Sequence, residues 1–251
     1  MENGFLLLSM RDKGNDIGVV RIYLKYERDM MGTGSSEKIA DRIANIFLSP
    51  DTITGLINGA LTVPLDLAYL ARGFFDTDNR FAYQTQRIRM AQAIHNDILN
   101  YDHIINAVEL IFEKFNKYLT IHQQDAVYRA VVSSIAGRFL TAKITSTIAG
   151  AVLARLSLVS AKSGARASGQ IAMLLLIGGM SERSIRTSEN LANESPEVYG
   201  ILRPHDYDLT YFLIEPAVEP FVEAIHIAVA RGQPEFDKIM NRVGEKLHVL
   251  Q

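Results

Sequence analysis

A histidine and two glutamates near the C-terminus have the spacing of a helical metal site. Glu219, Glu223 and His226 fall on one face of a predicted helix, and Glu223-Ala-Ile-His226 has the Glu-x-x-His form found in helical di-iron proteins. Such a site also requires a second motif of this kind and further glutamates facing the same interior. We instead interpret this face as solvated acidic side chains with His226 partly buried, and we predict no metal site and no cofactor.

Two other histidine groups place an imidazole near carboxylates. His205-Asp-Tyr-Asp208 lies in a Pro-rich segment, where a metal ion or a general base is conceivable. Asp102 and His103, with His95 two turns earlier, repeat the pairing on a predicted helix. We interpret the first group as a surface turn and the second as a helix surface or a core histidine.

The motifs of nucleophilic and nucleotide chemistry are incomplete in this sequence. No Gly-x-Ser-x-Gly elbow occurs, and Met31-Gly-Thr-Gly-Ser-Ser36 lacks the lysine of a phosphate-binding loop. We therefore predict no catalytic residue and favour a protein that is not an enzyme. A pocket that gathers His205, Asp206 and His226 would favour the enzyme alternative.

The composition excludes several classes of protein. The 251 residues contain no cysteine, so disulfide scaffolds, thiolate zinc sites and cysteine nucleophiles are excluded. The formal charge of -2 gives no cationic footprint of a nucleic-acid binder, and the cluster of Arg80, Arg87 and Arg89 is small. We predict no nucleic-acid partner.

The N-terminus does not have the pattern of a Sec signal. Glu2 stands where a basic region is expected, and the apolar run 5–8 is too short. We expect a soluble protein, cytoplasmic or exported by a route without a Sec signal, and membrane-associated when active.

The pattern of apolar residues predicts a mainly α-helical fold. β-formers at 5–10 and 17–26 flank a polar turn, which predicts an N-terminal β-hairpin within 1–30. Helices are expected from a cap at Ser35 or Ser36 onward, with an amphipathic stripe at 104–119 and a further strand at 207–214. We expect a helical domain at 31–192 and, packed on it in what is one domain overall, an acidic helical region at 193–251.

Residues 126–181 contain no acidic residue and six basic ones. Small residues recur every fourth position from Ala142 through Gly150 to Ala154, a spacing that lets helices approach closely in membranes and in soluble bundles. A stable membrane span needs about 18–20 residues with few charges, whereas Lys143 and Arg155 interrupt this stretch. The stretch therefore predicts a central apolar helical hairpin at 139–180 and no constitutive membrane span.

The arrangement at 139–181 resembles the pore-forming domains of channel-forming colicins, which are soluble helical bundles that hide a hydrophobic hairpin. The resemblance rests on the order of apolar limbs around a cationic joint and includes no diagnostic motif. Arg155 lies inside the first limb and the second limb is short, which departs from the colicin pattern. The resemblance implies a helical bundle that inserts its hairpin into a bilayer.

Our first hypothesis is a soluble-to-membrane protein, such as a bacterial toxin or effector that perturbs an anionic membrane. Lys162 and Arg166 would contact lipid headgroups. The residues expected to insert or to let helices associate are Gly150, Leu153, Ala154, Leu156, Leu174 and Leu176.

Two alternatives remain open from the sequence. The helices at 139–180 can be an ordinary core pair, because short apolar runs are more often buried core than membrane spans. The protein can also be a soluble interaction module, an adaptor or a toxin-neutralising partner, that binds a basic protein through its acidic 194–223 surface. The residues of that surface are Glu194, Glu197, Glu215, Glu219 and Glu223.

Overall fold

The computed structural model describes residues 36–49, 51–60, 80–96, 98–124, 137–163 and 169–249. These residues belong to one compact unit, Thr33–Gln251, and they contain helices and turns but no strand. The mainly α-helical fold is therefore confirmed for the described part of the chain. The β-hairpin expected within 1–30 lies outside the described residues.

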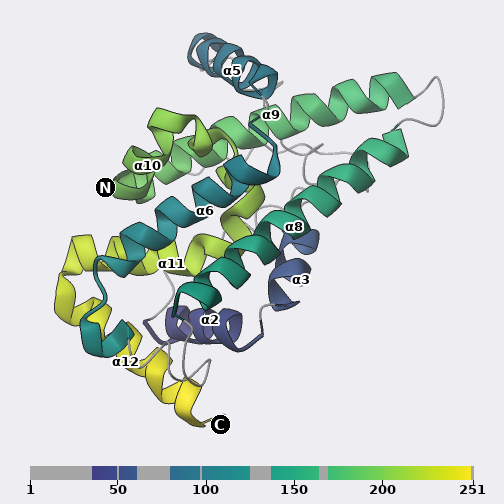
Figure 1. Cartoon of the computed structure of the whole chain (residues 1–251). Coiled ribbons are helices and arrows are strands. Elements are labelled where there is room, and N and C mark those ends of the chain that lie inside the picture. Colours follow the sequence, from purple (N-terminus) through teal and green to yellow (C-terminus); the bar gives the residue numbers. More distant parts are fainter. Residues whose placement is uncertain are drawn as a thin grey trace, which may run out of the picture. The chain divides into compact units, whose positions relative to one another are not determined.

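From α9 to α12 the helices follow one another with short connections (Figure 1). Two single-turn 3-10 helices, η1 and η2, form a corner between α10 and α11. The elements are α2 (Ser36–Leu48), α3 (Asp51–Ala60), α5 (Arg80–His95), α6 (Tyr101–Asn116), α8 (Gly137–Ser163), α9 (Gly169–Glu194), α10 (Pro196–Leu202), η1 (Arg203–His205), η2 (Tyr207–Leu209), α11 (Tyr211–Arg231) and α12 (Gln233–Val249).

The starts of α6 and α2 coincide with residues that favour the beginning of a helix. The Asn100 side chain accepts a 2.9 Å hydrogen bond from the backbone N–H of His103 and so caps α6. The amphipathic stripe predicted at 104–119 is buried along its length, as its spacing requires. Helix α2 begins at Ser36, next to the start expected from a cap at Ser35 or Ser36.

Helix α11 is the central element of the bundle. It packs against α2, α3, α6, α8, α9, α10 and α12, which surround it in Figure 1. Phe221 of α11 is fully buried and makes edge-to-face contacts with the rings of Phe47, Phe112 and Phe115, at centroid distances of 5.7, 4.8 and 5.2 Å. These aromatic contacts join α2 and α6 to α11.

Two prolines lie inside α11. Pro216 and Pro220 cannot donate the backbone hydrogen bonds of a regular helix, and an interior proline costs about 3 kcal/mol. Both prolines are buried among the surrounding helices, so tertiary packing offsets this cost. The helix therefore continues through a sequence that local propensity would interrupt.

The predicted central apolar hairpin is not present. Helices α8 and α9 follow each other and contact one another, but Ile144, Ile148 and Val152 of α8 face the core while Ser146 and Gly150 are exposed. Helix α9 continues to Glu194 through charged residues that are buried. The prediction was wrong because the apolar residues of α8 mark one buried face, and the centre of the bundle is α11.

The strand predicted at 207–214 is also wrong. Residues 207–209 form η2 and α11 begins at Tyr211. Asp206, which precedes them, has a left-handed backbone with φ of 60° and turns the chain between η1 and η2. The apolar residues of this segment are nearly continuous because the start of α11 is buried all round.

Candidate functional site

The five acidic residues singled out from the sequence come together in the structure. Glu215, Glu219 and Glu223 are spaced four residues apart along one face of α11, Glu194 is the last residue of α9, and Glu197 lies in the first turn of α10. The charge of Glu194 acts on the carboxyl groups of the three α11 residues. We call these five residues the acidic ridge.

Two arginines from distant parts of the chain face the ridge. Arg42 of α2 forms ion pairs with Glu219 and with Glu223, the second at 3.1 Å. Arg183 of α9 acts electrostatically on Glu215, and its guanidinium group lies 5.4 Å from the ring centroid of Phe212. The acidic residues of α11 are therefore partly neutralised within the chain and are not a simple solvated surface.

The ridge has more carboxyl groups than these cations neutralise. Among the described residues, Arg42 pairs with Glu219 and Glu223, and Arg183 acts on Glu215. His226, which is charged only when protonated, has its Nδ1 3.8 Å from Glu197. Like charges in a partly buried place disfavour one another's ionisation. The ridge is therefore expected to hold protons near neutral pH.

The pKa values follow this charge balance. Burial raises the pKa of Glu215 to about 8, although Arg183 lowers it, and burial raises the pKa of Glu223 to about 7 against the opposing effect of Arg42. The pKa values of Glu219 and Glu194 are raised by burial as well. Acidic groups with such pKa values change charge in the physiological range, which is typical of functional sites.

A second unusual feature is a run of polar residues inside the bundle. Residues 182–188 of α9 are all buried, and six of the seven are polar or charged. The Ser184 hydroxyl donates a 2.5 Å hydrogen bond to the carbonyl oxygen of Leu209, and the Ser188 hydroxyl donates a 2.6 Å bond to Asp208. We call residues 182–188 the buried polar segment.

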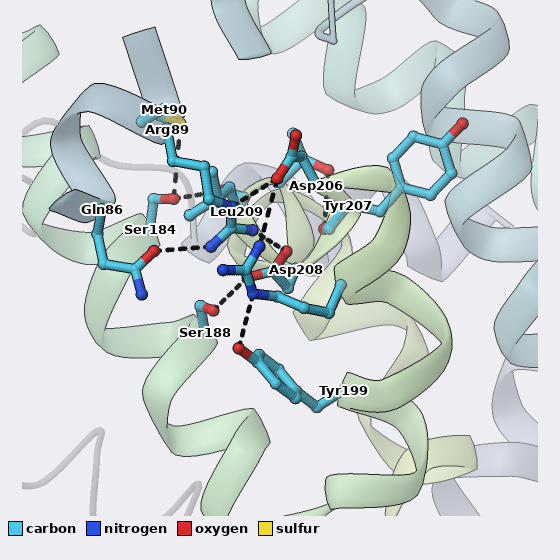
Figure 2. Close-up of polar contacts among 12 residues, drawn as sticks. Gln86, Arg89, Met90, Ser184, Ser188, Tyr199, Asp206, Tyr207, Asp208 and Leu209 are labelled. Carbon is cyan, nitrogen blue, oxygen red and sulfur yellow. Dashed lines mark hydrogen bonds and ion pairs between the residues drawn. The ribbon is translucent and has the colours of Figure 1, made fainter. Parts of the chain in front are cut away.

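Arg89 of α5 pairs with the η1–η2 corner, where Asp208 also accepts the hydrogen bond from Ser188 of this segment (Figure 2). Its Nε donates a 2.5 Å hydrogen bond to Asp206, its Nη2 pairs with Asp208, and its Nη1 donates a 2.7 Å bond to Gln86. Asp208 is fully buried, so its charge depends on Arg89 and Ser188 for stabilisation. Figure 2 shows these side chains converging from α5, α9 and the corner.

The histidines considered for catalysis do not form one site. His205 stacks on the ring of Tyr207 at 5.3 Å, and His103 Nδ1 lies 3.0 Å from the Tyr207 hydroxyl. His226 instead lies beside Glu197 of the acidic ridge. His205 and Asp206 are therefore neighbours in the corner, and His226 belongs to a different cluster.

The metal-site motif has a second copy that the sequence analysis did not use. Glu245-Lys-Leu-His248 also has the Glu-x-x-His form and falls on α12, where Glu245 is exposed and the side chain of His248 lies outside the described residues. Within the described part of the chain, no three histidine or acidic side chains are arranged to hold a metal ion.

The residues expected to act at a membrane are only partly described. On α8, Gly150 and Ala154 are exposed, with open space around Gly150, and Leu153 and Leu156 are half-buried against the core. Lys162, Leu174 and Leu176 lie on described helices, but their side chains are outside the description, as is Arg166 entirely. None of the helices in the described ranges is both long and apolar enough to cross a bilayer.

Sequence reasoning missed the cations that complete these clusters. Arg42 and Glu219 are 177 residues apart, and Arg89 and Asp208 are 119 apart, so no local spacing connects them. The one local signal is Arg183-Ser-Ile-Arg-Thr-Ser188, a polar run directly after an apolar one on the same helix.

The described part of the chain is thus an all-helical bundle with an acidic ridge along its central helix and a buried polar segment beside it. Comparison with family models, curated proteins and solved structures finds no match to this chain.

The pKa of Glu215 predicts how stability depends on pH. Because this pKa is about 8 in the folded protein and 4.5 in the unfolded chain, the contribution of Glu215 is complete below about pH 4.5 and is lost as the pH rises through about 8. We expect the free energy of unfolding, measured with denaturant, to fall by at least about 1 kcal/mol between pH 6 and pH 8.5, the equivalent of roughly one pKa unit.

The substitution Glu215→Gln should weaken this pH dependence, whereas Glu109→Gln, at an exposed position of α6, should leave it unchanged. A free energy of unfolding that rises with pH over this range would contradict the assignment.

Proposed function

We propose that the protein is a helical interaction module that binds a basic segment of another protein along the acidic ridge. The observation that carries the proposal is the gathering of five carboxyl groups from three helices, against which the described residues bring two arginines and one histidine. A lysine or arginine placed beside these groups would favour their ionised forms and lower their pKa values. The free energy gained in this way would contribute to binding.

The spacing of the ridge suits a helical partner. Residues four apart on α11 are about 6 Å apart along the helix axis, and cationic residues four apart on a partner helix have the same repeat. Glu194 is exposed and is the most accessible member of the ridge, whereas the side chain of Glu197, which faces His226, is 11% exposed. Arg42 already occupies the other end through Glu219 and Glu223.

Calorimetric titration with a designed helical peptide that carries lysine at every fourth position tests this proposal. Because the ridge holds protons near neutral pH, we expect binding to release protons and to be tighter at pH 8 than at pH 6. Binding should weaken when the salt concentration is raised to about 0.15 M or above, where the screening length is about 8 Å.

Matched variants identify the surface that binds the peptide. The double substitution Glu194→Gln and Glu197→Gln should weaken binding, while Glu109→Gln with Glu113→Gln, two exposed acids on α6, should have a smaller effect. Equal losses in both pairs would mean that the peptide responds to net charge alone and would reject the ridge as the site.

Conditional membrane insertion is a second candidate, favoured by the outer face of α8. The small residues Gly150 and Ala154 are exposed there, beside half-buried Leu153 and Leu156. In this mechanism Lys162 and Arg166 meet anionic headgroups first. Because the pKa values of the ridge are raised, protonation at low pH stabilises the packing of α11. We therefore expect contact with anionic lipid, and not low pH alone, to trigger insertion.

Dye release from vesicles that contain phosphatidylglycerol tests the second candidate. Release is expected at pH 7, and Lys162→Glu should reduce it while Lys117→Glu, at an exposed position after α6, should not. If no dye is released at pH 7 or at pH 5, or if both variants behave alike, the membrane candidate fails.

A further inference from the structure

His226 of α11 lies beside two members of the acidic ridge that belong to other helices. Its Nδ1 atom is 3.8 Å from Oε1 of Glu197 on α10, and its charge acts on the carboxyl group of Glu194 at the end of α9. Glu223, one turn earlier on α11, pairs with Arg42 of α2. Within the described part of the chain, the carboxyl groups that interact with His226 are therefore those of Glu194 and Glu197.

The contact between His226 and Glu197 depends on protonation. The Nδ1 atom of His226 is buried and has no hydrogen-bond partner among the described residues, although 45% of the side chain is exposed. The carboxylate that it faces is held in place, because the Ser195 hydroxyl donates a 2.9 Å hydrogen bond to the same Oε1 atom of Glu197. A protonated imidazole carries a hydrogen on both ring nitrogens and a positive charge, so only this form makes an ion pair with Glu197.

A basic partner would use the same two carboxyl groups. Glu194 is the most accessible member of the ridge, and Glu197 lies in the first turn of the next helix. Two positive charges at one place disfavour each other, and histidine is the side chain that ordinarily changes charge between pH 5 and 8. Protonated His226 therefore opposes a lysine or arginine of the partner at this position, and neutral His226 does not.

We infer that His226 is a proton-controlled competitor of the basic partner, which occupies the Glu194 and Glu197 part of the ridge when protonated and leaves it open when neutral. This inference rests on the proposed function, because it concerns the regulation of the same ridge. It adds a cause of pH dependence that is separate from the protonation of Glu215 and Glu223. A substitution at His226 can therefore change the pH dependence of binding while those two glutamates are kept.

Two substitutions at His226 test the inference with the helical lysine peptide. His226→Gln removes the titratable group, so we expect binding at pH 6 to be about twofold to fivefold tighter than in the unmodified protein, the effect of a partly exposed ion pair. Binding at pH 8 should be unchanged. His226→Lys keeps a positive charge at both pH values and should weaken binding at pH 8 by a similar factor. Both variants should fold, because the side chain is 45% exposed.

A measurement without any partner provides the second test. The charge of His226 lowers the pKa of Glu194. In a carbon-13 NMR titration, His226→Gln should therefore raise the midpoint of the Glu194 carboxyl group, which corresponds to a decrease of about twofold to fivefold in its acid dissociation constant. The matched control in both tests is His122→Gln, at an exposed position that follows α6, which should change neither peptide binding nor this midpoint.

The outcomes separate this inference from the proposed function. If the unmodified protein does not bind the peptide at pH 8, the proposed function fails, and the inference fails with it. If it binds at pH 8 but His226→Gln binds no more tightly than the unmodified protein at pH 6, the inference is overturned and the ridge remains the binding site. An unchanged midpoint of Glu194 in His226→Gln would overturn it as well, because His226 would then not act on that carboxyl group.

Discussion

The burial of charged groups on two neighbouring helices is the constraint on which this fold depends. Helix α9 buries Arg183 and its neighbours, and α11 carries Glu215, Glu219 and Glu223. A buried charge is costly unless an opposite charge or a hydrogen-bonding group stabilises it. Helix α2 brings Arg42 to Glu219 and Glu223 of α11. Helix α5 brings Arg89 to the buried carboxylate of Asp208 in the η1–η2 corner, which also accepts a hydrogen bond from Ser188 of α9.

Apolar contacts and polar contacts hold different helices in the bundle. Phe221 and the rings around it fix α2 and α6 on α11 by hydrophobic burial. The polar contacts fix the register of α9 and α5, since Ser184, Ser188 and Arg89 each need a partner at a defined distance. The pKa values of the ridge are raised by burial, so they follow from how α11 packs among its neighbours.

The sequence allowed the helical class and several helix positions to be predicted. The periodic stripe at 104–119 identified α6, and Ser36 marked the start of α2. The sequence did not predict that α11 continues through Pro216 and Pro220. Burial on all sides offsets the cost of a proline inside a helix, and this burial is visible only in the fold. The hairpin prediction failed because the apolar residues of α8, such as Ile144 and Ile148, form one buried face of a helix whose other face exposes Ser146 and Gly150.

The acidic ridge could be predicted in part. The spacing of Glu215, Glu219 and Glu223 is visible in the sequence, and the structure adds Glu194 and Glu197 to the same cluster, as the grouping by charge suggested. Arg42 could not be found, because its position beside Glu219 depends on how α2 packs against α11. Only the folded chain shows that these acids are half-buried and incompletely neutralised.

The central claim is that the ridge on α11 holds protons near neutral pH. A direct measurement is a carbon-13 NMR titration of the Glu215 side-chain carboxyl in the folded protein, with exposed Glu109 as an internal reference. We predict a midpoint at about pH 8 for Glu215. A midpoint near 4.5, the ordinary value for a glutamate, would contradict the account.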